Sequence, residues 1–111
     1  MKVRWKVGLA HQARQDFSAI LHWTTEHFGR RQARDYGTTL RSALKALADG
    51  PGIIGCRFHE ELGSGILSLH VARRARKGRH FILLRANAET KTIEVLRILH
   101  DCMDLALHLD D

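Results

Sequence analysis

The sequence predicts an α+β domain with two layers, in which a pair of helices covers one face of an antiparallel sheet. Two observations lead to this prediction. Apolar residues recur at helical spacing in the first half of the chain, whereas the second half carries strand-length apolar runs separated by polar breaks. The halves meet at Gly50-Pro51-Gly52, which holds the only proline of the chain and is its strongest break. A helical pair with apolar stripes needs a sheet face to cover, so the two halves are expected to pack together.

The first half is predicted to contain a strand and an α-helical hairpin. Residues 3–9 alternate bulky apolar with mostly charged side chains, as in an N-terminal strand with one buried face. Apolar residues at steps of three and four predict one amphipathic helix from Ala10 to Phe28 and a second from Ala33 to Leu47. Gly29 follows the first helix, where glycine suits the end of a helix. Because so short a turn joins the helices, they are expected to lie antiparallel.

The second half is predicted to form a three-stranded antiparallel meander and a short C-terminal helix. Its apolar runs cover residues 66–72, 79–86 and 92–99, and the short breaks between them favour antiparallel neighbours. In the last segment, Cys102, Leu105 and Leu109 fall at helical spacing, and Asp101 stands where it can cap a helix. All these elements are expected to form a single domain that covers residues 1–111.

Composition and charge narrow the kinds of partner. The 18 Lys and Arg residues against 12 Asp and Glu residues give a net charge of +6, which favours an anionic partner such as nucleic acid or an acidic protein. The alternative is that the charge only keeps a small domain soluble. No apolar run approaches the ~20 residues of a membrane helix, and the N-terminus lacks the apolar stretch of a secretory signal. With only two cysteines, far apart, we expect a cytoplasmic protein without a membrane partner.

The most concentrated charge lies between the first two strands of the predicted meander. Five cations occur within residues 73–79, namely Arg73, Arg74, Arg76, Lys77 and Arg79. Such a connection cannot be buried and offers a platform for phosphates or carboxylates. A solvated hairpin tip is the alternative, and no aromatic residues interleave to stack nucleic-acid bases.

Two arginines in the predicted strands need an explanation. Arg85 ends one strand, and Arg97 lies inside the apolar stretch 95–99 of the next. A charge in such a strand must reach an edge or find a carboxylate, because burying it unpaired is costly. The candidate carboxylates are Glu60, Glu61 and Asp104. The alternative is that the arginines and His100 form an anion-binding or acid–base site, as in metal-free ribonucleases.

No metal or cofactor is expected. The histidines do not show the i, i+4 spacing around a glutamate that makes a zinc-binding helix. The glycine-rich pieces 50–52 and 63–65 lack the lysine and the following helix of a phosphate-binding loop, so they are predicted to be turns.

The chain also carries a set of residues that together resemble a known family. In the helical half they are Ala13, Asp16, Phe17, Ile20, Phe28-Gly29, Gln32-Ala33, Tyr36, Leu40, Leu44, Leu47 and Pro51. In the strand half they are His80-Phe81-Ile82, Arg85, Arg97-Ile98-Leu99-His100, Met103-Asp104 and His108-Leu109. This set resembles the ParE branch of the RelE/ParE toxin superfamily, and the stretch from residue 97 to residue 109 is its most specific part.

The resemblance implies a RelE-like fold and the toxin of a type II toxin–antitoxin module. Such a toxin poisons DNA gyrase and blocks replication without catalytic residues of its own. A ParD-like antitoxin with an acidic tail holds it in a hetero-oligomer. The residues that would bind the target are the five cations of the 73–79 run together with Arg97, His100, Met103 and Asp104. Those that would bind the antitoxin are Trp23, Tyr36 and Arg85, and core packing is the alternative for the first two.

Two other functions are compatible with the sequence. The superfamily also contains ribosome-dependent messenger RNA endonucleases, for which Arg85, Arg97 and His100 would be the catalytic residues. Here His100 is followed by Asp101 rather than by an arginine, and the tail has no tyrosine. The pattern therefore follows ParE toxins rather than the nucleases. The third function is that of a non-toxic module kept only for binding an antitoxin.

Overall fold

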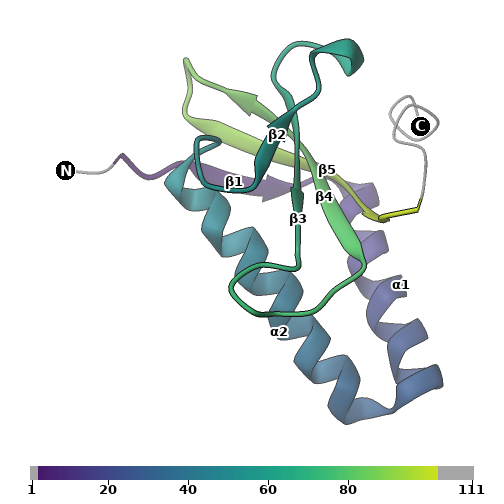
Figure 1. Cartoon of the computed structure of the whole chain (residues 1–111). Coiled ribbons are helices and arrows are strands. Elements are labelled where there is room, and N and C mark those ends of the chain that lie inside the picture. Colours follow the sequence, from purple (N-terminus) through teal and green to yellow (C-terminus); the bar gives the residue numbers. More distant parts are fainter. Residues whose placement is uncertain (1–2, 103–111) are drawn as a thin grey trace.

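The computed structural model describes residues 3–102 and shows a helical hairpin lying against a sheet (Figure 1). The helices are α1 (His11–Phe28) and α2 (Arg30–Ala46). The strands are β1 (Lys6–Leu9), β2 (Cys56–Phe58), β3 (Ile66–His70), β4 (His80–Asn87) and β5 (Thr92–His100), and short 3-10 turns cover Leu47–Asp49 and Glu60–Leu62. The predicted α+β architecture is confirmed.

The strands form one sheet in the order β1-β5-β4-β3-β2. The predicted meander of β3, β4 and β5 is antiparallel throughout, whereas β1 lies parallel to β5 at one edge. β2 pairs antiparallel with β3 at the other edge and was not predicted. Leu83 pairs with Arg97 and Leu84 with Val95, so Leu96 is the extra residue of a bulge in β5.

Of the two elements predicted at the ends of the chain, the first differs from the structure and the second is not tested. The first strand begins at Lys6 rather than at Val3, whose side chain is 62% exposed. Trp5 packs instead against the turn that follows α2, where a Cβ added to Gly50 would lie 2.8 Å from Trp5 Nε1. From Met103 onward, the predicted C-terminal helix lies outside the described residues.

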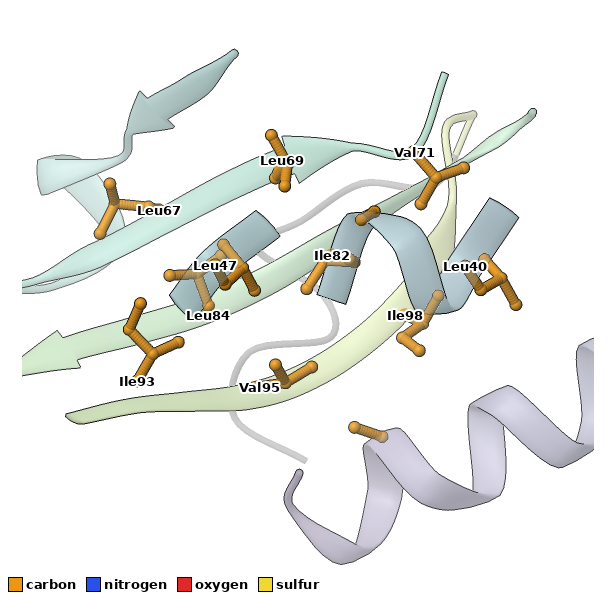
Figure 2. Packing of buried hydrophobic residues seen from close by; sticks show 12 residues of the cluster. Leu40, Leu47, Leu67, Leu69, Val71, Ile82, Leu84, Ile93, Val95 and Ile98 are labelled. Carbon is orange, nitrogen blue, oxygen red and sulfur yellow. The ribbon is translucent and has the colours of Figure 1, made fainter. Parts of the chain in front are cut away.

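The main core lies between the hairpin and the side of the sheet that faces it. Leu40 and Leu47 enter it from the helical layer, and neither has any exposed surface. Figure 2 shows them beside the sheet residues Leu67, Leu69, Val71, Ile82, Leu84, Ile93, Val95 and Ile98. Each fully buried aliphatic side chain contributes about 1.5–3 kcal/mol. The contact between the two layers is therefore the main source of stability.

The opposite side of the sheet carries a smaller apolar cluster. Ile66, Phe81, Leu83 and Leu99 form it, and Leu62 of the second 3-10 turn packs against them. This turn therefore covers part of the face that the helices leave open.

The two halves of the hairpin relate differently to the sheet. We call residues 11–20 and 37–46 the near half, and residues 21–36 the far half, which extends past the sheet in Figure 1. The near half buries Leu40 and Ala43, whereas the far half buries only Thr24 and Ala33. Gly29 alone joins the helices, with a φ of 91°, which glycine adopts without steric cost. The far half is therefore free to contact something other than the sheet.

Candidate partner-binding groove

An open groove of about 750 Å³ lies between the far half of the hairpin and the first residues of β4. Its helical wall consists of Ala19, Ile20, Trp23, Thr24, Phe28, Gln32 and Tyr36. Its other wall consists of Lys77, Gly78, Arg79, His80 and His100. The groove thus pairs a mainly apolar wall with a wall rich in cations and histidines.

The apolar wall displays an aromatic cluster. Trp23 is 54% exposed and Phe28 is 58% exposed. The Trp23 ring stacks on His27 at 4.1 Å between centroids and meets the edge of Phe28 at 5.8 Å. Such large exposed aromatic side chains typically mark a surface that a partner covers. Trp23 is therefore not part of the core, which was the alternative to a binding role.

Tyr36 ties the two walls of the groove together. Its hydroxyl accepts the Arg79 backbone N–H at 3.1 Å and lies 2.6 Å from His80 Nδ1. In the tautomer that leaves Nδ1 of a neutral His80 unprotonated, the Tyr36 hydroxyl donates its own proton to this nitrogen. A Cβ added to Gly78 would lie 2.6 Å from Val71 Cγ2 and 3.2 Å from the Tyr36 ring. Only glycine therefore lets the chain pass this close to α2.

Burial keeps His80 neutral. Partial burial, followed by the neighbouring His100, lowers the pKa of His80 from 6.5 to about 4. The His80 and His100 rings meet edge to face at 5.4 Å between centroids. Burial also raises the pKa of Tyr36, so its hydroxyl keeps its proton. The Tyr36–His80 hydrogen bond is thus a contact between neutral groups near pH 7.

Asp101 anchors the end of the sheet beside the groove. Its carboxylate accepts a hydrogen bond from His70 Nε2 at 3.1 Å and pairs with Arg79 at 3.3 Å. The hydrogen bond from His70, together with the positive charge of Arg79, holds the pKa of Asp101 below its ordinary value. Asp101 therefore fixes Arg79 at the rim of the groove.

The basic run 73–79 is only partly free. Arg73 donates to the Ile54 carbonyl at 3.4 Å, Arg76 donates to Thr39 Oγ1 at 3.2 Å, and Arg79 is held by Asp101. Arg74 has a φ of 49°, which marks a tight bend. Among residues 3–102, neither Arg74 nor Lys77 forms an ion pair. The run is thus a connection held at three points, by Ile54, by Thr39 of α2 and by Asp101, and two of its cations are left for a partner.

Arg97 has a structural partner that the sequence did not indicate. It binds Asp16 of α1 in a bidentate pair, with Nε 2.8 Å from Oδ2 and NH2 3.1 Å from Oδ1. Glu60 and Glu61 are therefore wrong as its partners, and Asp104 lies outside the described residues. Asp16 Oδ2 also accepts the Ile98 N–H at 2.9 Å. β1 pairs with β5 only as far as Val95. Beyond the end of β1, the Asp16 carboxylate accepts a backbone N–H of β5 in place of a neighbouring strand.

The three residues considered for ribonuclease chemistry do not converge in the structure. His80 pairs with His100 in the sheet. Arg85 stands five residues further along β4, which places it about 16 Å along the strand from His80. The Arg97 guanidinium is turned to Asp16. His100 Nδ1 accepts the Cys102 N–H at 3.3 Å. Arg85 is therefore far from His100, and the Arg97 guanidinium is engaged by Asp16.

Of the other predicted site residues, the structure brings Trp23, Tyr36, Lys77, Arg79 and His100 to one groove. Arg85 lies outside it on β4, and Met103 and Asp104 fall outside the described residues. Sequence reasoning missed Phe28 and His80 as groove residues. The one sign of Phe28 in the sequence was its position directly before Gly29, which ends the helix. An apolar residue at a helix end that lies beyond the core remains exposed.

The cluster around His59 is not a candidate site. His59 Nε2 lies 2.7 Å from Ser68 Oγ and His59 Nδ1 lies 3.2 Å from Glu61, but Ser68 is only 9% exposed, which closes it to a substrate. In the described part of the chain, no group of His, Cys, Asp and Glu side chains is placed to hold a metal ion. Within the same residues, neither helix combines the length and the hydropathy needed to cross a membrane.

Two solved structures that share this fold come from toxin–antitoxin systems. The chromosomal ParDE system from P. aeruginosa has a chain with a TM-score of 0.71 and 20% identity, covering 87% of this chain and 96% of that one. The RelBE2 complex from Mycobacterium tuberculosis has a chain with a TM-score of 0.60 and 23% identity, covering 90% and 94%. At these identities the likeness shows the fold, which is the RelE-like fold that the sequence predicted.

The sequence comparisons are more specific. The family model described as the ParE toxin of the type II toxin–antitoxin system parDE matches residues 7–105. The chain therefore belongs to the ParE toxin family. Toxin ParE1 of Caulobacter vibrioides is 28% identical over 101 residues, which make up 91% of this chain and 94% of that protein. The resemblance to ParE toxins found in the sequence is confirmed.

Proposed function

We propose that this ParE-family toxin inhibits DNA gyrase in the cytoplasm, blocks replication, and is neutralised by an antitoxin that fills the groove. The observation that carries the proposal is the extent of the family match, which runs from β1 through the whole of β5. A toxin of a type II system has two partners, namely its target and its antitoxin.

The groove supports the antitoxin part of the proposal. An amphipathic helix can lay its apolar face on Trp23 and Phe28 while its carboxylates meet Lys77 and Arg79. A helix with its side chains is about 10–12 Å wide, which suits an open groove of this size. Tyr36 would then act as the fixed floor between the two walls. Arg85, on β4 away from the groove, would contact an extended part of the antitoxin that runs along the sheet.

The target-binding part of the proposal assigns the unpaired cations of the basic run to gyrase. Arg74 and Lys77 are the members of the run whose side chains form neither an ion pair nor a hydrogen bond among the described residues. Arg73, Arg76 and Arg79 would support them by holding the connection in place, and His100 borders the same region. Arg97 would act through Asp16, by fixing the end of β5 from which Met103 and Asp104 follow.

The test is plasmid supercoiling by purified gyrase with the full-length chain added, following both loss of supercoils and the appearance of linear DNA. Inhibition with trapped cleaved DNA is the expected result. The variant Arg74→Asn/Lys77→Ala should inhibit at least tenfold less well, since asparagine tolerates the positive φ of residue 74. The matched control Lys6→Ala/Arg57→Ala also removes two exposed cations, from β1 and β2, and should inhibit like the parent.

Two outcomes would contradict the proposal. A folded chain that stops growth but leaves gyrase untouched would direct attention to messenger RNA on the ribosome, to be tested there with His100→Gln. A folded chain that neither stops growth nor affects gyrase would leave a non-toxic module that only binds an antitoxin.

A further inference from the structure

The outer flank of α2 carries a stripe of cations that the groove and the basic run do not use. Arg30, Arg34, Arg41 and Lys45 all lie exposed on this helix. At 100° of rotation per residue, the four positions fall within about 60° of the helix circumference. The stripe extends over 15 residue steps, which corresponds to about 22 Å along the helix axis.

In the part of the chain that the structure describes, no carboxylate pairs with this stripe. Among residues 3–102, none of the four cations forms an ion pair. The acidic residues of the hairpin are engaged or turned elsewhere: Asp16 binds Arg97, and Glu26 pairs with His22 at 2.8 Å. Asp35 lies about 110° around α2 from the middle of the stripe, as helix geometry requires.

One cation of the stripe is held in place by its neighbours. The Arg41 guanidinium lies 5.9 Å from the centre of the Phe17 ring of α1. It also lies against Gly37, where an added Cβ would be 3.2 Å from Arg41 NH2. Glycine inside a helix destabilises it relative to alanine, and here it leaves room for the arginine to lie flat along the surface. Arg41 thus contacts both its own helix and α1, and its position puts the stripe on the exposed flank of α2 that adjoins α1.

The composition of the stripe indicates the kind of partner. Stable protein interfaces have a core with apolar and aromatic residues. Between the cations of this stripe stands Thr38, a hydroxyl side chain, and no exposed apolar residue. A linear set of cations without an apolar anchor fits a partner whose negative charges repeat along a line. Duplex DNA carries one charge per about 1.7 Å of its axis, so 22 Å presents on the order of a dozen phosphates.

We propose that the outer flank of α2, through Arg30, Arg34, Arg41 and Lys45, binds the phosphate backbone of duplex DNA without reading its sequence. Gln32 and Tyr36, the α2 residues that line the groove, lie on the other flank of the helix. DNA on the stripe and a partner in the groove can therefore be bound together. The inference does not depend on gyrase being the target.

Fluorescence anisotropy of a labelled 20-base-pair duplex of random sequence, titrated with the full chain at 50–200 mM KCl, tests the proposal. The affinity should fall steeply with salt, with a logarithmic slope of about −3 to −4 for four phosphate contacts. In Arg34→Ala/Lys45→Ala the slope should become less negative by about two, and the affinity at 100 mM salt should fall roughly tenfold. Lys6→Ala/Arg57→Ala, which removes the same charge elsewhere, should stay within about twofold of the parent. Circular dichroism checks that each variant folds.

Three results would overturn the proposal. The first is no binding of the duplex at 50 mM KCl. The second is an equal loss in both double variants, which would mean that net charge rather than the stripe attracts DNA. The third is displacement of the duplex by polyglutamate at equal charge concentration, with the same sensitivity to Arg34→Ala/Lys45→Ala, which would assign the stripe to an acidic protein. Gyrase inhibition measured on the same variants separates this inference from the proposed function, because either can fail alone.

Discussion

The near and far halves of the hairpin have the same secondary structure and opposite surroundings. In the near half, Leu40 has no exposed surface and packs against the sheet. In the far half, Trp23 and Phe28 leave more than half of their surface exposed. Burying a large aromatic side chain is favourable. Because Trp23 and Phe28 remain exposed, the far half contributes less to the stability of the fold than the near half. The comparison indicates that one half of the hairpin maintains the fold and the other is available for binding.

The largest expected effect is in the near half. Leu40→Ala removes a fully buried side chain at the layer contact and should lower the free energy of unfolding by about 3–4 kcal/mol. Urea denaturation followed by circular dichroism measures it. Ile54→Ala, at a side chain that is 92% exposed, is the control and should change stability by less than about 0.5 kcal/mol. A loss below about 1 kcal/mol for Leu40→Ala would break the distinction between the halves.

The next effect concerns the carboxylate that joins the near half to β5. Asp16→Ala removes the carboxylate that binds both Arg97 and the Ile98 N–H, in a pair whose side chains are only 15–17% exposed. We expect a loss of about 3 kcal/mol. Adding Arg97→Met should recover part of it, since the largely buried arginine charge is then removed together with the Asp16 carboxylate. If the double variant were no more stable than Asp16→Ala, the pair would not be the cause. Glu26→Ala, at an exposed carboxylate of the same helix, is the matched control.

In the far half, the effect should appear in binding rather than in folding. Trp23→Ala is expected to weaken antitoxin binding by about 2 kcal/mol, close to thirtyfold, because exposed aromatic anchors dominate interfaces of this kind. Its free energy of unfolding should change by less than about 1 kcal/mol. Isothermal titration calorimetry with the purified antitoxin, beside urea denaturation of the free toxin, measures both. An unchanged affinity would remove the groove from the antitoxin interface.

The smallest effect lies at the boundary between the halves, in the Tyr36–His80 contact. The pKa of His80 is about 4 in the folded chain, below its ordinary value of 6.5. Between pH 6.5 and 4 the unfolded chain therefore binds more protons than the folded one, and stability falls as the pH drops through this window. With allowance for solvent screening, we expect about 1 kcal/mol.

Urea midpoints at pH 7 and pH 5 measure this change. His80→Gln, which removes the titrating group, should reduce the difference between the two values. His11→Gln, at an exposed histidine at the start of α1, should leave it unchanged. A pH dependence that is identical in all three proteins would show that other groups cause it.

The order of the elements was accessible from the sequence because the hairpin and the meander have long periodic patterns. β2 was missed because Cys56-Arg57-Phe58 is too short to show alternation. The bulge at Leu96 was also hidden, since the stretch from Val95 to Leu99, which is apolar apart from Arg97, gives no sign of a register shift.

The candidate site was accessible only in part. Trp23 and Tyr36 stood out as aromatic residues on the hairpin, and both line the groove. The Asp16–Arg97 pair spans 81 residues of sequence, and no local pattern connects a carboxylate on a helix with one particular arginine on a distant strand. The groove itself arises where the far half passes the start of β4, so its shape depends on the packing of the two layers.

The position of Asp16 also has a consequence for how copies of this chain meet one another. A sheet recruits foreign strands through free backbone groups at its edges. Here the outer strands β1 and β2 have only four and three residues. In the part of β5 that β1 does not cover, the Ile98 N–H already donates a hydrogen bond to Asp16. A newly made copy that meets another before its partner arrives finds few groups on which to add a strand, and this limits growth into fibrils.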